Sequence, residues 1–120
     1  MIKIEAIVRE EKYEDVKAAL NDIDVHGITV SQVMGCGVQK GYTGVVRGTK
    51  VDVNMLPKIK FEIVVPTEEW IDRTVKAIRQ AALTGKHGDG KIFVYDLMNT
   101  VRIRTGQTGP DAIYHEETVY

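Results

Sequence analysis

Three glycines and two lysines fall within the eight residues from Thr84 to Lys91, directly before the apolar run that begins at Ile92. Glycine permits positive φ, so a loop can turn successive N–H groups inward, and lysine supplies the charge that a polyphosphate needs. The segment is therefore a candidate phosphate-binding loop. A plain helix-to-strand connection, for which Gly85 as a C-cap residue would suffice, is the alternative.

The spacing from Gly85 to Gly90 and Lys91 matches the G-x-x-x-x-G-K part of a P-loop, but Ile92 stands where a magnesium-binding Ser or Thr belongs. The order of elements is also reversed, because a P-loop follows a strand and opens a helix, whereas this loop follows a helical pattern and opens a strand. A nucleotide bound here would have no helix N-terminus behind its phosphates. Its metal ion would need a ligand from elsewhere in the chain.

Hydrophobic spacing predicts the elements that position this loop. Alternating apolar residues predict strands, and apolar residues three and four apart predict two amphipathic helices, the second with Thr67 as N-cap and with Ile71, Val75, Ile78 and Ala82 on its buried face. The predicted strands are 2–8, 28–34, 59–65, 92–95 and a short fifth at 101–104, and the helices are about 13–23 and 67–82. This order predicts an α+β, ferredoxin-like βαββαβ sandwich with a small appended strand.

The pattern breaks down from Gly35 to about Met55, where glycines are scattered among polar residues. A loop of this length inside a compact domain is usually either functional or wrongly assigned. This one carries too little apolar surface to be core, so we interpret it as a mobile loop that faces a partner. A looser alternative is a hairpin with arms at 45–46 and 51–53 and with Arg47-Gly48 at its tip.

Length and composition fit one domain, because 120 residues can bury a core without bound metal ions or disulfide bonds. The charge is balanced, with 16 Lys+Arg against 17 Asp+Glu, so nothing in the totals indicates nucleic acid or an acidic membrane surface. The single cysteine, Cys36, excludes an internal disulfide, and the N-terminus has no signal-peptide character. A cytoplasmic protein is the simplest expectation.

The order and spacing of many short segments form the most specific signal in the chain. They are Gly35-Cys36-Gly37, Gln39-Lys40-Gly41, Arg47-Gly48, Leu56-Pro57-Lys58, Glu62-Ile63-Val64-Val65, Thr84-Gly85-Lys86, Gly88-Asp89-Gly90-Lys91-Ile92-Phe93-Val94 and Val101-Arg102-Ile103-Arg104-Thr105-Gly106. In these segments, from Met1 to about Ile113, the chain resembles the PII nitrogen signal-transduction family. The resemblance implies a homotrimer that binds ATP or ADP between subunits, senses 2-oxoglutarate with Mg²⁺ and ATP, and regulates targets without being an enzyme.

The resemblance also assigns the loops. The irregular span at about 37–55 would be the flexible T-loop that contacts targets, and 84–91 would be the B-loop that holds phosphates. Residues from about 114 to 120 would extend past the usual family end.

The resemblance implies a role for each of the following residues. The nucleotide would be bound by Thr29, Gly35, Cys36, Gly37, Val38, Gln39, Lys58, Glu62, Val64, Thr84, Gly85, Lys86, Gly88, Asp89, Gly90, Lys91, Arg102 and Arg104. The two arginines would share one strand face and reach a nucleotide held mainly by the neighbouring subunit. The 2-oxoglutarate residues would be Gln39, Lys40, Gly41 and Lys58, with Gln39 as the magnesium ligand, and Tyr42, Arg47 and Gly48 would contact a partner.

Three positions depart from the family pattern. Val51 stands where a nucleotidylated tyrosine is usual, so modification there is chemically excluded, and Thr49 stands where some relatives carry a phosphorylated serine. Val38 replaces a phosphate-binding arginine, which would weaken ATP binding or shift the balance between ATP and ADP. Arg47 is retained, which makes an ammonium channel the leading partner and the only route to a membrane; nitrogenase, glutamine synthetase or a transcriptional regulator are other family targets.

Two other functions fit the same order of elements. A small phosphate-handling enzyme of the acylphosphatase type would need a nucleophile and a base, but His26, His87 and His115 are scattered along the chain. An RNA-recognition domain would need paired aromatic residues for base stacking, and the third predicted strand offers only Phe61.

Overall fold

Four strands form one antiparallel sheet in the order β2-β5-β1-β6. The computed structural model describes residues 1–36, 44–46, 49–51 and 55–114, with side chains described for 1–36 and 55–114. The elements are β1 (Ile2–Arg9), a 3-10 turn (Glu10–Lys12), α1 (Tyr13–Asp22), β2 (Ile28–Cys36), β3 (Gly44–Val46), β4 (Thr49–Val51), β5 (Met55–Val65), α2 (Glu69–Ala82), β6 (Lys91–Asp96) and a second 3-10 turn (Gly109–Ala112).

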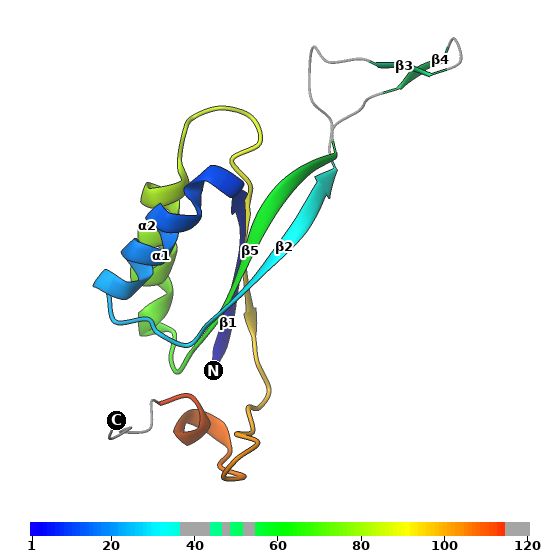
Figure 1. Cartoon of the computed structure of the whole chain (residues 1–120). Coiled ribbons are helices and arrows are strands. Elements are labelled where there is room, and N and C mark those ends of the chain that lie inside the picture. Colours follow the sequence, from blue (N-terminus) through cyan, green and yellow to red (C-terminus); the bar gives the residue numbers. More distant parts are fainter. Residues whose placement is uncertain (37–43, 47–48, 52–54, 115–120) are drawn as a thin grey trace.

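Both helices cover one face of this sheet (Figure 1). Residues of β1 alternate between buried and partly exposed, and Ile2, Ile4, Ala6 and Val8 are buried as the sequence predicts. Phe61 at the centre of β5 is fully buried among them. The expected α+β, ferredoxin-like arrangement is therefore confirmed, because β1 pairs antiparallel with β5 on one side and with β6 on the other.

The buried face of α2 is rotated from the predicted one. Thr74, Ile78 and Ala82 are buried at four-residue spacing, whereas Ile71 and Val75 are only partly buried. The prediction of Thr67 as N-cap is wrong: Glu68 holds that position, no side chain there makes a capping bond, and the Thr67 backbone carbonyl accepts from Trp70 N at 3.2 Å.

Thr74→Val is expected to stabilise the fold by about 1 kcal/mol, because it removes a buried hydroxyl and keeps the side-chain shape. Within the described chain, Thr74 Oγ1 is buried and has no hydrogen-bond partner. Urea unfolding at fixed protein concentration measures the change. Thr74→Ala is the matched control and should destabilise, because it also removes a packed methyl group; a Val variant no more stable than the parent would show that the hydroxyl is satisfied.

The predicted strand at 101–104 is wrong. Val101 forms one isolated bridge with Thr108, and the chain between them turns back through Gly106, whose φ is 73°. Arg102 N donates to the carbonyl of Gln107, and Gly106 N donates to the carbonyl of Arg102. Arg102 and Arg104 therefore do not share a strand face, because the segment turns back on itself and, among the described residues, pairs only through the Val101–Thr108 bridge.

The hairpin alternative within 37–55 is confirmed in part. β3 and β4 pair antiparallel, so one arm lies at 44–46 and the other at 49–51, two residues earlier than predicted. The predicted end of β2 at Met34 is also wrong, because Gly35 and Cys36 continue the strand opposite Leu56 and Met55. No helix in the described ranges has the length and apolar character required to cross a membrane.

Candidate functional site

The glycine-rich segment connects α2 to β6 and passes over the end of β1 (Figure 1). α2 ends where Leu83 becomes extended, and Gly85, Gly88 and Gly90 follow with φ of 85°, 96° and 100°. A Cβ at Gly90 would lie 1.7 Å from the backbone oxygen of Ile7, so only glycine fits there. The three glycines are thus needed for the shape of the loop, beyond the single C-cap that a plain connection requires.

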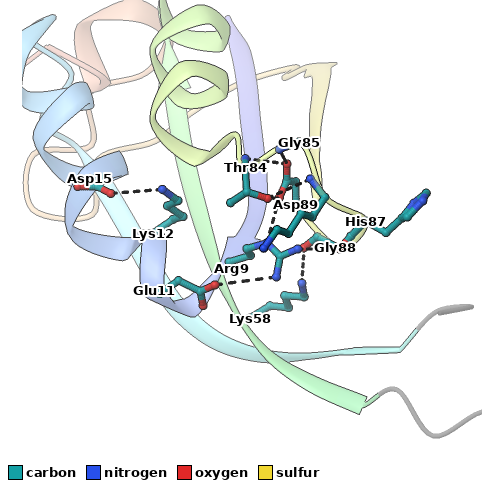
Figure 2. Close-up of polar contacts among 11 residues, drawn as sticks. Arg9, Glu11, Lys12, Asp15, Lys58, Thr84, Gly85, His87, Gly88 and Asp89 are labelled. Carbon is teal, nitrogen blue, oxygen red and sulfur yellow. Dashed lines mark hydrogen bonds and ion pairs between the residues drawn. The ribbon is translucent and has the colours of Figure 1, made fainter. Parts of the chain in front are cut away.

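The Asp89 carboxylate organises this loop from inside (Figure 2). Its Oδ2 accepts from the backbone N–H groups of Thr84 and Gly85, each at 2.9 Å. Its Oδ1 accepts from the Thr84 hydroxyl and from Arg9 Nε, the latter at 2.9 Å. Asp89 therefore ties both ends of the loop together and to β1.

These bonds hold the pKa of Asp89 well below its ordinary value, with the Thr84 hydroxyl as the largest cause and Arg9 the next. A depressed carboxyl pKa stabilises the folded loop above the unfolded pKa, which is about 3.9 for Asp. The contribution is lost only as the pH falls toward the lowered folded value. The Asp89 carboxylate is consequently charged at neutral pH.

Two cations from the sheet contact the loop carbonyls. Arg9 Nη2 donates to the His87 carbonyl at 2.6 Å, and Lys58 Nζ donates to the Gly88 carbonyl at 2.5 Å. Arg9 and Lys58 face each other across β1 and β5, and Lys58 is 9% exposed. Gly35 lies against the Lys58 stem, since a Cβ at Gly35 would be 3.0 Å from Lys58 Cγ.

Three predicted nucleotide residues lie together farther along the sheet. Thr29 pairs with Glu62 across β2 and β5, and Val64 lies two residues beyond Glu62 on the same face. Glu62 Oε1 is 3.0 Å from Lys3 Nζ, so this carboxylate has a cationic partner in the chain. This face is opposite the one that the helices cover, because the alternate residues Phe61 and Ile63 are in the core.

The other predicted site residues lie on the loop surface, apart from the loop, or outside the described chain. The segment after β6, which carries Arg102 and Arg104, lies at the opposite end of the sheet (Figure 1). Arg102 Nη2 donates to the carbonyls of Ala112, at 3.1 Å, and Tyr114. Cys36 is exposed at the end of β2, and Lys86 and Lys91 are exposed on the loop. Gly37, Val38, Gln39, Lys40, Gly41, Tyr42, Arg47 and Gly48 fall outside the residues whose side chains the structure describes.

Arg9 is the residue that sequence reasoning missed. It looks like one more polar residue on the alternating first strand, and its partners Asp89 and His87 are 80 and 78 residues away in sequence. No local pattern in the sequence marks it, because its contacts depend on how the end of β1 meets the loop in the fold.

The sheet order and the helices on one face define a ferredoxin-like α+β fold, and the glycine loop lies over one end of its sheet. A family model described as "Nitrogen regulatory protein P-II" matches residues 1–107. Proteins named Nitrogen regulatory protein P-II from Pasteurella multocida and Rhodospirillum rubrum are 51% and 50% identical over 113 residues, which cover 94% of this chain and 100% of each relative. Nitrogen regulatory protein P-II 1 from Methanothermobacter thermautotrophicus is 54% identical over 113 residues, covering 94% of this chain and 97% of the relative.

The chain therefore belongs to the nitrogen regulatory protein P-II family. The name of the family describes regulation rather than catalysis, and this favours a signalling role over the acylphosphatase and RNA-binding alternatives.

Proposed function

We propose that this chain is a cytoplasmic PII signalling protein that binds ATP or ADP at the 84–91 loop and 2-oxoglutarate together with Mg²⁺ and ATP. Its output is the shape of the T-loop at 37–55, which regulates a nitrogen-metabolism target such as an ammonium channel. The observation that carries the proposal is the loop itself, a glycine-rich turn whose conformation is fixed by Asp89, Arg9 and Lys58.

The charge around the loop supports phosphate binding. Lys86 and Lys91 are exposed on it, and Lys58 lies beneath it. Thr29, Glu62 and Val64 would accommodate the adenine end, since Glu62 is four residues from Lys58, roughly 13 Å along β5. A nucleotide would thus lie along the open face of the sheet, with its phosphates toward the loop.

The position of Arg102 and Arg104 supports a trimer. Because these arginines lie at the far end of the sheet from the loop of their own chain, they would act on a nucleotide held by a neighbouring subunit. Phe93, Val94 and Tyr95 of β6 are each more than 40% exposed, a degree of apolar exposure along one strand that fits burial against another copy.

The remaining family roles extend the proposal. Lys58 suits a 2-oxoglutarate carboxylate, because a buried ammonium bound to a neutral carbonyl gains from a charged acceptor. Gln39, Lys40 and Gly41 would complete that site, and Gln39 would hold Mg²⁺ through its carbonyl oxygen. Tyr42, Arg47 and Gly48 would contact the target, and these T-loop residues lie outside the described side chains.

Calorimetry on the full chain tests this function. We expect ATP and ADP to bind, and 2-oxoglutarate to bind only with Mg²⁺ and ATP present. Lys91→Gln should weaken ATP binding about 10-fold or more, because a charge-assisted bond to phosphate is lost. Lys76→Gln, which removes an exposed lysine from α2, is the matched control and should bind normally; a parent chain that binds neither nucleotide would refute the proposal.

A further inference from the structure

We propose that Arg9 is a positioning residue for phosphate binding, which acts by fixing the direction of loop N–H groups and makes no contact with the phosphate. The proposal rests on the nucleotide-binding function proposed above and assigns to Arg9 the orientation of the loop before the nucleotide binds.

One guanidinium holds the loop at two points. Arg9 Nη2 donates to the His87 carbonyl at 2.6 Å, while Arg9 Nε donates to Asp89 Oδ1 at 2.9 Å (Figure 2). The Arg9 side chain is 20% exposed and lies between β1 and the loop. A planar fork that contacts two fixed acceptors restricts both distance and orientation, which a lysine ammonium does not do.

The planar trans peptide converts this restraint on a carbonyl into a direction for an N–H group. In such a unit the C=O and the following N–H point in opposite directions. Arg9 holds the His87 carbonyl and Lys58 holds the Gly88 carbonyl, so the N–H groups of Gly88 and Asp89 point away from the two cations. Two successive N–H groups on one side of a glycine turn form a concavity that suits an anion.

Gly88 allows the loop to approach the guanidinium. Its φ is 96°, and a Cβ there would lie 3.3 Å from Arg9 Nη2. A side chain at this position would therefore crowd the Arg9 guanidinium, which orients the peptide between His87 and Gly88.

The bonds of the Asp89 side chain exclude its carboxylate from direct contact with phosphate. Its carboxylate already accepts from Thr84 N, Gly85 N, the Thr84 hydroxyl and Arg9, and a carboxylate would repel a phosphate. The N–H groups of Thr84 and Gly85 are likewise used inside the loop. Asp89 is thus the second residue, with Arg9, that fixes the loop. The backbone N–H groups available to a phosphate would be those that follow Gly85.

Substitutions at Arg9 distinguish two roles of its guanidinium: positioning of the loop by the planar fork, and attraction of the phosphate by the positive charge. We expect Arg9→Gln to weaken ATP binding at least 10-fold and Arg9→Lys to weaken it at least 5-fold, because lysine keeps the charge and loses the fork. Glu11→Gln is the matched control: Glu11 Oε1 lies 3.9 Å from Arg9 Nη1 and the Glu11 side chain is 67% exposed, so its variant should bind within twofold of the parent. Full affinity in Arg9→Lys, or affinity within twofold in Arg9→Gln, would overturn the positioning role.

Amide hydrogen exchange without nucleotide provides the second measurement. The Thr84 and Gly85 N–H groups should be protected in the parent, and Asp89→Asn should reduce that protection about 10-fold while exchange in β1 and β5 stays unchanged, which shows that the variant folds. Equal protection of these N–H groups in the parent and in Asp89→Asn would contradict the role of the Asp89 carboxylate in fixing the loop. A parent chain with a protected loop that binds no ATP would refute the proposed function together with this inference, whereas normal ATP binding by the parent and by the Arg9 variants would refute this inference alone.

Discussion

Gly90→Ala is expected to destabilise the protein by about 3–4 kcal/mol, the sum of a left-handed conformation for an L-residue and an overpacked contact. The contact cannot relax cheaply, because the added Cβ would lie 1.7 Å from the Ile7 backbone oxygen and 2.8 Å from its carbonyl carbon. Ile7 pairs with Lys91 in the β1–β6 ladder, so a displaced loop would also disturb the sheet. Urea unfolding at fixed protein concentration measures the loss, and nucleotide binding should weaken with it.

Gly85→Ala is the matched control for this prediction. Its φ is 85°, and an added Cβ would have no neighbour within 4 Å, so only the conformational cost of about 1–2 kcal/mol applies. Equal stability losses in the two variants would contradict the steric argument and leave only the φ argument standing.

Phe61→Ala is expected to cost about 3–5 kcal/mol, because it removes a fully buried ring from the middle of the core and leaves a cavity. The ring stacks on Tyr13 with centroids 5.9 Å apart and planes 18° apart, so the substitution also loosens α1 from the sheet. Thermal unfolding followed by circular dichroism measures the effect.

Phe61→Leu is the matched control, because it keeps an apolar side chain at the site and should cost less than about 1.5 kcal/mol. A Phe61→Ala variant as stable as the Leu variant would mean that the core repacks around the lost ring.

The sheet could be predicted because its signal is local. The alternation in β1 follows from one buried face, and Ile2, Ile4, Ala6 and Val8 carry it without knowledge of the partner strands. The predicted strand at 101–104 had the same alternation and was wrong, because a strand also requires a partner edge. Within the part of the chain that the structure describes, Val101 forms one isolated bridge, with Thr108.

The sequence predicted the glycines of the candidate site but not the side-chain contacts that hold the loop in place. Gly85, Gly88 and Gly90 indicate positive φ from residue type alone. The role of Arg9 could not be read from the sequence, because it depends on a contact between the end of β1 and a loop about 80 residues later. Asp89 was predicted among the nucleotide-binding residues, but the sequence did not indicate that its carboxylate would bond to Thr84 and Arg9 and so support the loop.

β2 and β5 continue as a two-stranded ribbon past the end of β1 (Figure 1). Arg9 faces Lys58 at the last rung of the β1–β5 ladder, while Met34, Gly35 and Cys36 still pair with Pro57, Leu56 and Met55. This overhang extends roughly 10 Å beyond the sheet, and Lys58 lies at its base. Because Lys58 Nζ also donates to the Gly88 carbonyl, one side chain joins the base of the ribbon to the glycine loop.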